Sequence, residues 1–171
     1  MTIWAKKLGV VALAAMMVAA APGAALASDA DTLREAQDRA QIEALMWDYV
    51  RAIDSFNPDA YVNVFTPDGA FGATRGRDAL RKMVVDLKKS QNDRRAKGEQ
   101  ILAMHHIVTN ASIEFVDKDH ARYRYYWMTV FGGAAGVEPA PRVAAVGRGV
   151  DDVVRVNGKW LIQTRNVAPK D

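Results

Sequence analysis

Apolar residues in the first half of the chain follow the period of an α-helix. Between about Arg34 and Ser55 they recur every three or four residues. The wide apolar face that results consists of Ile42, Leu45, Met46, Tyr49, Ile53 and Phe56. Asn57-Pro58 ends this predicted helix, because proline disfavours helical geometry in the residue before it. Two more helices are expected, a short one over residues 58–65 and a longer one over 76–89.

The second half of the chain changes to the alternating period of β-strands. Strands are expected at residues 101–116, 120–131, 142–156 and 159–167, with a short candidate at 70–74. The charged segment 90–98 is expected to be a solvated loop. Helices followed by an antiparallel meander predict an α+β fold, with helices packed on one face of a curved sheet.

Glycine positions refine this picture of the sheet. Asn157-Gly158 favours the type I′ turn that joins two antiparallel strands, so the last two strands are expected to form a hairpin. Gly147 and Gly149 lie inside the third long strand and suggest a bulge or a bend. Arg148 between them is expected to form a structural ion pair with Asp151 or Asp152.

The first 27 residues have the pattern of a secretory signal peptide. Lys6 and Lys7 precede an apolar run over 8–21, and Ala25-Leu26-Ala27 is a small-x-small cleavage site. The run is short for a bilayer span, so cleavage before Ser28 is expected, with an uncleaved anchor as the alternative. Export to the periplasm or the medium, with one domain over 28–171, is the resulting prediction.

Charge and cysteine content narrow the function classes. Without the leader, 21 basic residues stand against 20 acidic ones, and this balance makes nucleic acid a poor candidate partner. The chain has no cysteine, so neither a lipid anchor on cysteine nor a disulfide framework is available. The hydrophobic core alone is expected to hold the fold.

His106 and Asp54 are the strongest candidates for chemistry. Asp54 ends the first predicted helix and His106 begins a predicted strand. A histidine beside a carboxylate can take a proton and return it to a leaving hydroxyl, and the carboxylate fixes the tautomer of the ring. The alternatives are a core histidine bonded to a backbone carbonyl and an aspartate that is simply solvated.

Metal and cofactor sites are not expected. His105 and His106 are adjacent on a strand and point to opposite faces, so they cannot easily share a metal ion. The sequence contains neither a nucleophile signature nor a dinucleotide-binding fingerprint.

Aromatic and amide side chains are candidates for lining a ligand cavity. Tyr125 and Trp127 share a strand face, so a hydroxyl and an indole could both reach a flat, hydroxylated ligand. Asn110 shares the strand parity of His106, and Trp47 shares a helix stripe with Asp54. Tyr49 is the fifth candidate. Core packing is the alternative for most of the aromatic residues.

Six short segments occur in an order typical of one known family. They are Tyr49-Val-Arg-Ala-Ile-Asp54, Phe65-Thr-Pro-Asp68-Gly-Ala, Arg75-Gly76-Arg77-Asp-Ala-Leu80, His105-His106-Ile-Val-Thr109-Asn110, Gly147-Arg148-Gly-Val-Asp-Asp152 and Gly158-Lys-Trp160-Leu-Ile162. On these residues the chain resembles the SnoaL-like branch of the nuclear transport factor 2-like superfamily. The resemblance covers about Arg39 to Val167 and implies a cone-shaped α+β barrel.

Within that superfamily the chain is most similar to scytalone-dehydratase-like proteins. Those proteins place an aspartate at the end of the first helix and a histidine at the start of a central strand, where this chain has Asp54 and His106. They carry a tyrosine at the position of Ile53 and a second histidine at the position of Tyr125.

The resemblance implies a cofactor-independent lyase, of the dehydratase or formaldehyde-releasing type, or an isomerase. A hydroxylated aromatic or polycyclic small molecule would be the substrate, with His106 as acid and base and Asp54 orienting it. Tyr49, Asn110 and Tyr125 would position substrate oxygens. A non-catalytic binding module and an accessory subunit are the alternatives on the same fold. Relatives commonly pair through the sheet, so a homodimer or homotrimer is also implied.

Overall fold

A computed structural model of the protein describes residues 28–132 and 140–170. The predicted signal peptide lies outside the described residues. The elements in chain order are α1 (Asp29–Asp54), α2 (Pro58–Asn63), β1 (Phe65–Phe71), β2 (Thr74–Arg75), α3 (Arg77–Ala96), β3 (Ala103–Phe115), β4 (His120–Gly132), β5 (Arg142–Val156) and β6 (Lys159–Asn166). In the described part of the chain, no helix combines the length and the apolar character needed to cross a membrane.

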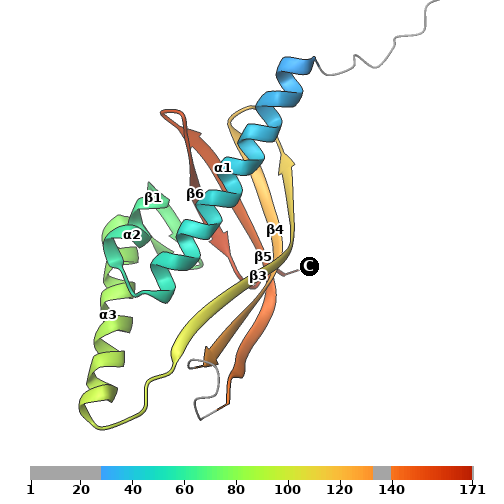
Figure 1. Ribbon diagram of the computed structural model, residues 1–171. Helices are drawn as coiled ribbons and strands as arrows, with labels where there is room; N and C mark the ends of the chain where they lie inside the picture. The colour runs from blue at the N-terminus through green and yellow to red at the C-terminus, as the bar shows by residue number, and fades with distance from the viewer. Residues whose placement is uncertain (1–27, 133–139, 171) are drawn as a thin grey trace, which may run out of the picture.

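The six strands form one mixed sheet in the order β2-β1-β6-β5-β4-β3. All neighbours are antiparallel except β1 and β6, which run parallel. The helix α1 crosses one face of the curved sheet, and α2 and α3 lie on the β1 side (Figure 1). The predicted α+β class is therefore confirmed. The sheet is open, with β2 and β3 at its two edges, rather than closed into a barrel.

The core fills the space between the helices and the concave sheet face. Five of the six residues predicted for the apolar face of α1 are buried: Ile42, Leu45, Met46, Tyr49 and Ile53. They pack with Tyr61, Phe65, Leu80 and Ile162, which are completely buried. Phe56 is only partly buried, because it follows the end of α1 and has a positive φ of 50°.

The helix α3 is longer than its sequence pattern indicated. The prediction of a loop over residues 90–98 is wrong for its first seven residues, since the helix continues to Ala96. Its exposed side is held by ion pairs one turn apart, such as Lys89 with Asp93 at 2.6 Å. Only Leu80 and Val84 are buried along α3, so its polar second half extends beyond the core.

β-Bulges in β3, β5 and β6 decide which side chains of these strands face the helices. In β3 the pairing with β4 shifts between Thr109 and Ser112, and Asn110 there has a φ of 52°. Extra residues also occur at Ala144 in β5 and at Gln163 in β6. Each extra residue turns the remainder of its strand to the opposite face, because side chains alternate with a period of two.

Gly147 and Gly149 do not form the predicted bulge, since their pairing with β4 is regular. They leave room for aromatic rings on the neighbouring strand. A Cβ atom on Gly149 would overlap the Tyr125 ring, and one on Gly147 would lie 2.8 Å from the Trp127 ring. Glycine is required here because the two rings lie directly over the backbone of β5.

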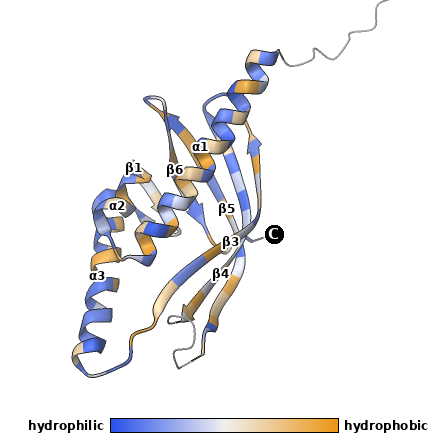
Figure 2. Ribbon diagram, viewed as in Figure 1, coloured by the Kyte–Doolittle hydropathy of each residue, from blue (hydrophilic) through white to orange (hydrophobic). Residues whose placement is uncertain are grey.

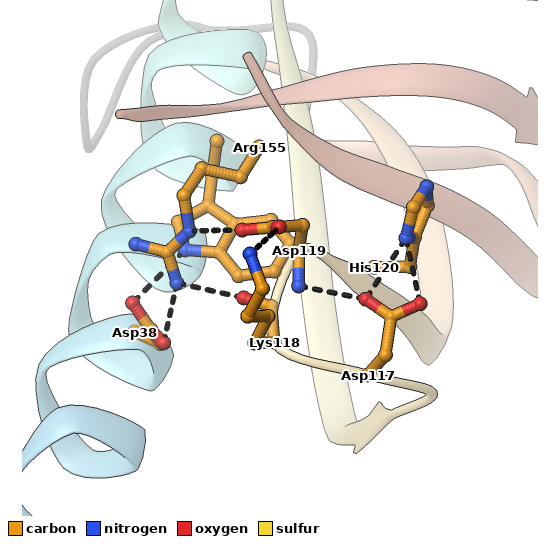
Figure 3. A network of polar contacts seen from close by, with 7 residues as sticks. Asp38, Asp117, Lys118, Asp119, His120 and Arg155 are labelled. Carbon is orange, nitrogen blue, oxygen red and sulfur yellow. Dashed lines mark hydrogen bonds and ion pairs between the residues drawn. The ribbon is translucent and has the colours of Figure 1, made fainter. Parts of the chain in front are cut away.

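A polar network fixes the first half of α1 to the sheet (Figure 3). The buried carboxylate of Asp38 accepts a hydrogen bond from the Trp160 indole at 3.2 Å and pairs with Arg155 at 2.5 Å. The Arg155 guanidinium also contacts Asp119 and stacks on the Trp160 ring. These contacts hold the first half of α1 against β5 and β6.

Candidate functional site

The end of α1 meets β3 at a paired carboxylate and imidazole. The Asp54 Oδ1 lies 2.6 Å from Nδ1 of His106, and Asp54 Oδ2 accepts the backbone N–H of His106 at 3.0 Å. Both side chains are about one-fifth exposed. The expected contact between the carboxylate and the imidazole is therefore present, and a second hydrogen bond joins the carboxylate to the backbone of His106.

The second of these bonds follows from the position of β3 at the edge of the sheet. An edge strand has backbone groups without a neighbouring strand, and these groups need other partners. Asp54, as the last residue of α1, supplies the acceptor for the N–H of His106. A carboxylate that holds both the backbone and the ring leaves the imidazole little freedom to rotate.

His106 opens onto a cavity of about 170 Å³. The cavity is lined by Tyr49, Phe71, His106, Val108, Trp127, Thr129, Ala145, Arg165 and Val167. Most of this lining is apolar, with a few polar groups that differ in chemistry. Such a mixture is typical of small-molecule sites, in which apolar walls hold the ligand and a few polar groups orient it.

Two of the five predicted ligand-contacting residues, Tyr49 and Trp127, line this cavity. The indole N–H of Trp127 donates to the carbonyl of Val167 at 2.9 Å, so the ring contributes an apolar wall rather than a donor. Burial raises the pKa of the Tyr49 hydroxyl above its ordinary value, with the charge of Arg165 opposing this effect. Tyr49 therefore remains a neutral hydroxyl at physiological pH.

The other three predicted residues lie elsewhere. Tyr125 is buried, and its hydroxyl donates to Asp151 at 3.0 Å, so it does not reach the ligand as expected. Trp47 is 62% exposed on the outer side of α1. Asn110 occupies the bulge in β3 and lines a separate hollow with Tyr126 and Lys170. The bulge breaks the parity on which its placement beside His106 depended.

A buried ion pair behind the cavity was not found from the sequence. Arg165 pairs with Asp151, and their side chains are 4% and 0% exposed. Burial raises the pKa of Asp151 to about 6, and the neighbouring guanidinium opposes this shift. The expected pairing of Arg148 with Asp151 is therefore wrong for Asp151, whose partner is Arg165. Asp152 instead contacts Arg122 and Thr164.

From the alternation of residues along β6, Arg165 would be expected on the outer face of the sheet. Trp160 and Ile162 face the core, so strict alternation would place Thr164 inside and Arg165 outside. The extra residue Gln163 reverses this order and turns Arg165 inward, opposite Asp151. Asp151 lies on the same strand face as Val153, and both are buried. Because a buried carboxylate needs a cation beside it, Asp151 was the one signal in the sequence for a basic side chain in the core.

No group of three histidine, aspartate or glutamate side chains within residues 28–132 and 140–170 is arranged to hold a metal ion. The described chain does contain a second histidine–aspartate pair, His120 with Asp117 at 2.9 Å. Both of those side chains are more than half exposed at the turn between β3 and β4, away from the cavity. The expectation that the protein uses neither a metal nor a cofactor stays a prediction.

Comparisons with proteins of known structure agree on the fold. A putative scytalone dehydratase from Novosphingobium aromaticivorans is 23% identical, with a TM-score of 0.60 over 78% of this chain and 85% of that chain. A nuclear transport factor 2-like protein with a cystatin-like fold from the same organism is 22% identical, with a TM-score of 0.64 over 83% and 88%.

A third similar structure belongs to a Mycobacterium tuberculosis protein described as having unknown function. It is 25% identical, with a TM-score of 0.60 over 78% of this chain and 72% of that chain. No curated protein sequence matches the chain. A sequence model of the SnoaL-like domain matches residues 34–166, most of the chain. Together with the helix-covered sheet and its cavity, this match shows that the protein belongs to the SnoaL-like domain family.

Proposed function

We propose that this protein is a cofactor-independent lyase or isomerase that acts on a small hydroxylated aromatic or polycyclic compound. Dehydration is the reaction that the site favours. The observation that carries the proposal is the double hydrogen bond from Asp54 to His106 at the wall of a largely apolar cavity. A ligand carrier would need the apolar cavity, whereas a fixed acid–base pair serves proton transfer.

The two nitrogens of His106 have separate tasks in this reaction. Nδ1 is bonded to Asp54, which leaves Nε2 for the substrate. Nε2 takes a proton from carbon, and the imidazolium that forms is stabilised by the Asp54 carboxylate. The same Nε2–H then protonates the departing hydroxyl. A carbon–carbon double bond forms, a carbon–oxygen bond breaks, and water leaves, so the imidazole ends in its starting state.

The dimensions of the site limit the substrate. An apolar cavity of about 150 Å³ is large enough for benzene, so 170 Å³ accommodates one aromatic ring. A polycyclic substrate would place its reacting ring here and extend through the mouth of the cavity. Trp127 and Phe71 supply flat apolar walls, and the Thr129 hydroxyl lies on the strand position directly opposite His106.

A screen for ligands followed by turnover tests this proposal. Mature protein would be screened by thermal shift against hydroxylated aromatic, polyketide and steroid compounds, since a ligand that binds only the folded state raises the Tm. Mass spectrometry of each hit would then detect loss of water, loss of formaldehyde or rearrangement. Hits that bind and remain chemically unchanged, with wild type and His106→Ala alike, would favour the non-catalytic binding module.

We further propose that the protein is exported and pairs with a second copy of itself. The Ala25-Leu26-Ala27 site supports export, and mass measurement of protein from the cell envelope would show whether the chain begins at Ser28. The proposal of pairing rests on the sheet, along whose strands apolar positions alternate with polar ones (Figure 2).

The sheet face opposite α1 supports the pairing. Ile107, Met128 and Val146 form one row across three strands, and Ile107 and Val146 are 44% and 67% exposed. Exposed apolar rows of this kind mark contact surfaces. Sedimentation of Val146→Lys against wild type tests it, because a charge in the row should shift the oligomer toward monomer.

A further inference from the structure

A second hollow, of about 230 Å³, lies between the last turns of α3 and the end of the sheet where β4 ends and β5 begins (Figure 1). Its lining consists of Gln91, Arg94, Gln100, Leu102, Phe131 and Arg142. Two guanidinium groups from different elements therefore face the same space. Among the described residues that line it there is no acidic side chain. The proposed proton transfer uses none of these residues.

This α3 hollow lies on the same sheet face as the cavity beside His106. Phe131 is two positions from Thr129 on β4, so their side chains share a face and lie roughly 7 Å apart along the strand. Arg142 pairs with Phe131, and Ala145 pairs with Thr129. One extra residue of β5 between Arg142 and Ala145 puts both on this face, whereas strict alternation would place Arg142 outside. A ligand with its ring in the cavity can therefore extend along β4 to Arg142.

The stripe of α3 that faces the sheet becomes polar as it approaches the hollow. Its members recur every three or four residues and are Leu80, Val84, Leu87, Gln91 and Arg94. Leu80 and Val84 are buried in the core, whereas Gln91 and Arg94 line the hollow. A helix that served only to cover the sheet would continue with apolar side chains beside Leu102. Amide and guanidinium groups at these positions indicate a polar ligand.

Both guanidinium groups keep N–H donors that the described part of the chain does not use. Arg94 donates its Nε–H to Glu99 at 2.6 Å, and its terminal nitrogens have no acceptor among the described residues. Arg142 lies over the Phe131 ring, 5.1 Å from the centroid, and pairs with no described carboxylate. Stacking on a ring orients a guanidinium but leaves its N–H groups available for a ligand.

The charge of the hollow indicates which anion it would take. Glu99 offsets one of the two positive charges, so one positive charge is in excess. A carboxylate balances that excess. A phosphate monoester carries about −1.5 to −2 at pH 7 and would leave negative charge beside Glu99. The planar fork of a guanidinium also matches the two oxygens of a carboxylate.

We propose that the α3 hollow binds a carboxylate group of the substrate, whose aromatic ring occupies the cavity beside His106. This inference rests on the proposed function and narrows its substrate class to acidic aromatic compounds. Arg94 and Arg142 are the specificity-determining residues. They hold the carboxylate at a fixed distance from the imidazole and take no part in the proton transfer, so the carboxylate keeps its charge throughout.

The test compares 4-phenylbutanoate with its neutral isostere 4-phenylbutanamide, with dissociation constants measured by titration followed by nuclear magnetic resonance. Wild type should bind the acid about tenfold more tightly, because each of two exposed charge-assisted contacts contributes modestly. Arg94→Gln and Arg142→Gln should each lower this preference about threefold, and the double variant should abolish it. Both side chains are exposed, so the Tm of these variants should stay close to that of wild type.

Arg95→Gln is the matched control. It removes the same charge one position along α3, where the side chain bonds Asn92 and does not line the hollow. The preference for the acid should remain that of wild type. Equal losses in Arg95→Gln and Arg94→Gln would mean that the ligand responds only to the overall charge of α3, and would overturn the proposal. So would a wild type without any preference.

A third probe, 3-phenylpropyl phosphate, checks the choice of anion. It should bind more weakly than the acid at pH 7, and tighter binding that is lost in the same variants would overturn the assignment to a carboxylate.

Two outcomes separate this inference from the proposed function. His106→Ala should keep the preference for the acid, because binding at the hollow does not depend on proton transfer. A preference that survives in the Arg94→Gln/Arg142→Gln variant overturns the carboxylate site and leaves the lyase proposal standing. A preference that is lost in that variant, with no turnover of any hydroxylated aromatic acid, supports the site and contradicts the lyase proposal.

Discussion

The carboxylate of Asp54 contacts His106 at two points, the ring Nδ1 at 2.6 Å and the backbone N–H at 3.0 Å. The first residue comes from the end of a helix and the second from an edge strand, 52 positions apart in the chain. The backbone bond fixes the strand against the helix, and the ring bond fixes the imidazole within the cavity. Structural support and the candidate chemistry therefore depend on the same side chain.

Replacing His106 with Ala should lower turnover of the substrate found by screening about 10²–10⁴-fold, because the described cavity lining offers no other imidazole. Binding of the substrate and the Tm should change little. The matched control is His105→Ala, since His105 is exposed and points away from the cavity. Equal losses of turnover in the two variants would place the proton transfer elsewhere.

Replacing Asp54 with Asn preserves size and one hydrogen-bond acceptor but removes the charge that stabilises the imidazolium. Turnover should fall about 10²-fold or more, and the dependence of kcat on pH should change at its acidic limb. The double variant Asp54→Asn/His106→Ala should be no slower than His106→Ala, because residues that act as one unit do not give additive losses. Additive losses in this cycle would show that the two side chains act separately.

Gly149→Ala should destabilise the protein by about 1–3 kcal/mol or more, because its Cβ would overlap the buried Tyr125 ring. Urea unfolding gives the free energy directly. In a Tyr125→Leu background the added cost should be smaller, since the ring that creates the overlap is gone. A cost that is unchanged in that background would show that the strain comes from the backbone instead.

The stability of the folded protein should depend on pH through the buried carboxyl of Asp151. Its pKa is raised to about 6 by burial, whereas an aspartate in the unfolded chain titrates near 3.8. A raised pKa means that the folded state binds the proton more tightly. The stabilising contribution is therefore fully present below pH 4 and is lost as the pH rises through 6.

Asp151→Asn has no carboxyl to titrate at this position, so its free energy of unfolding should increase relative to wild type, by about 2 kcal/mol, between pH 4 and pH 7. Urea unfolding of both proteins at several pH values measures the difference. A difference that does not change with pH would contradict the raised pKa.

The sequence by itself determined the class of the fold. The three- to four-residue spacing of Ile42, Leu45, Met46, Tyr49 and Ile53 predicted the buried face of α1, and all five are buried. The Asn157-Gly158 hairpin was equally predictable, because its turn requires positive φ at both positions, and they have φ of 50° and 78°. These features depend on local backbone geometry and on burial of apolar surface, which a periodic pattern records directly.

Asp54 and His106 were also named from the sequence, because each occupies the terminus of a predicted element. The resemblance to a family with residues of this kind at matching places supplied the pairing. Their catalytic roles remain predictions. What the residues alone offered was a carboxylate at the end of a predicted helix and an imidazole at the start of a predicted strand.

The rest of the site was decided only by tertiary structure. Asn110 lies outside the cavity and Arg165 lines it, in both cases because one extra residue in the strand changes which face the side chains take. The position of such a bulge depends on how the strand pairs with its neighbour. The alternation of polar and apolar residues within one strand therefore does not reveal it. The hydroxyl of Tyr125 and the indole of Trp127 donate to Asp151 and to the carbonyl of Val167, because buried polar groups bond to the acceptors that the packed fold brings near.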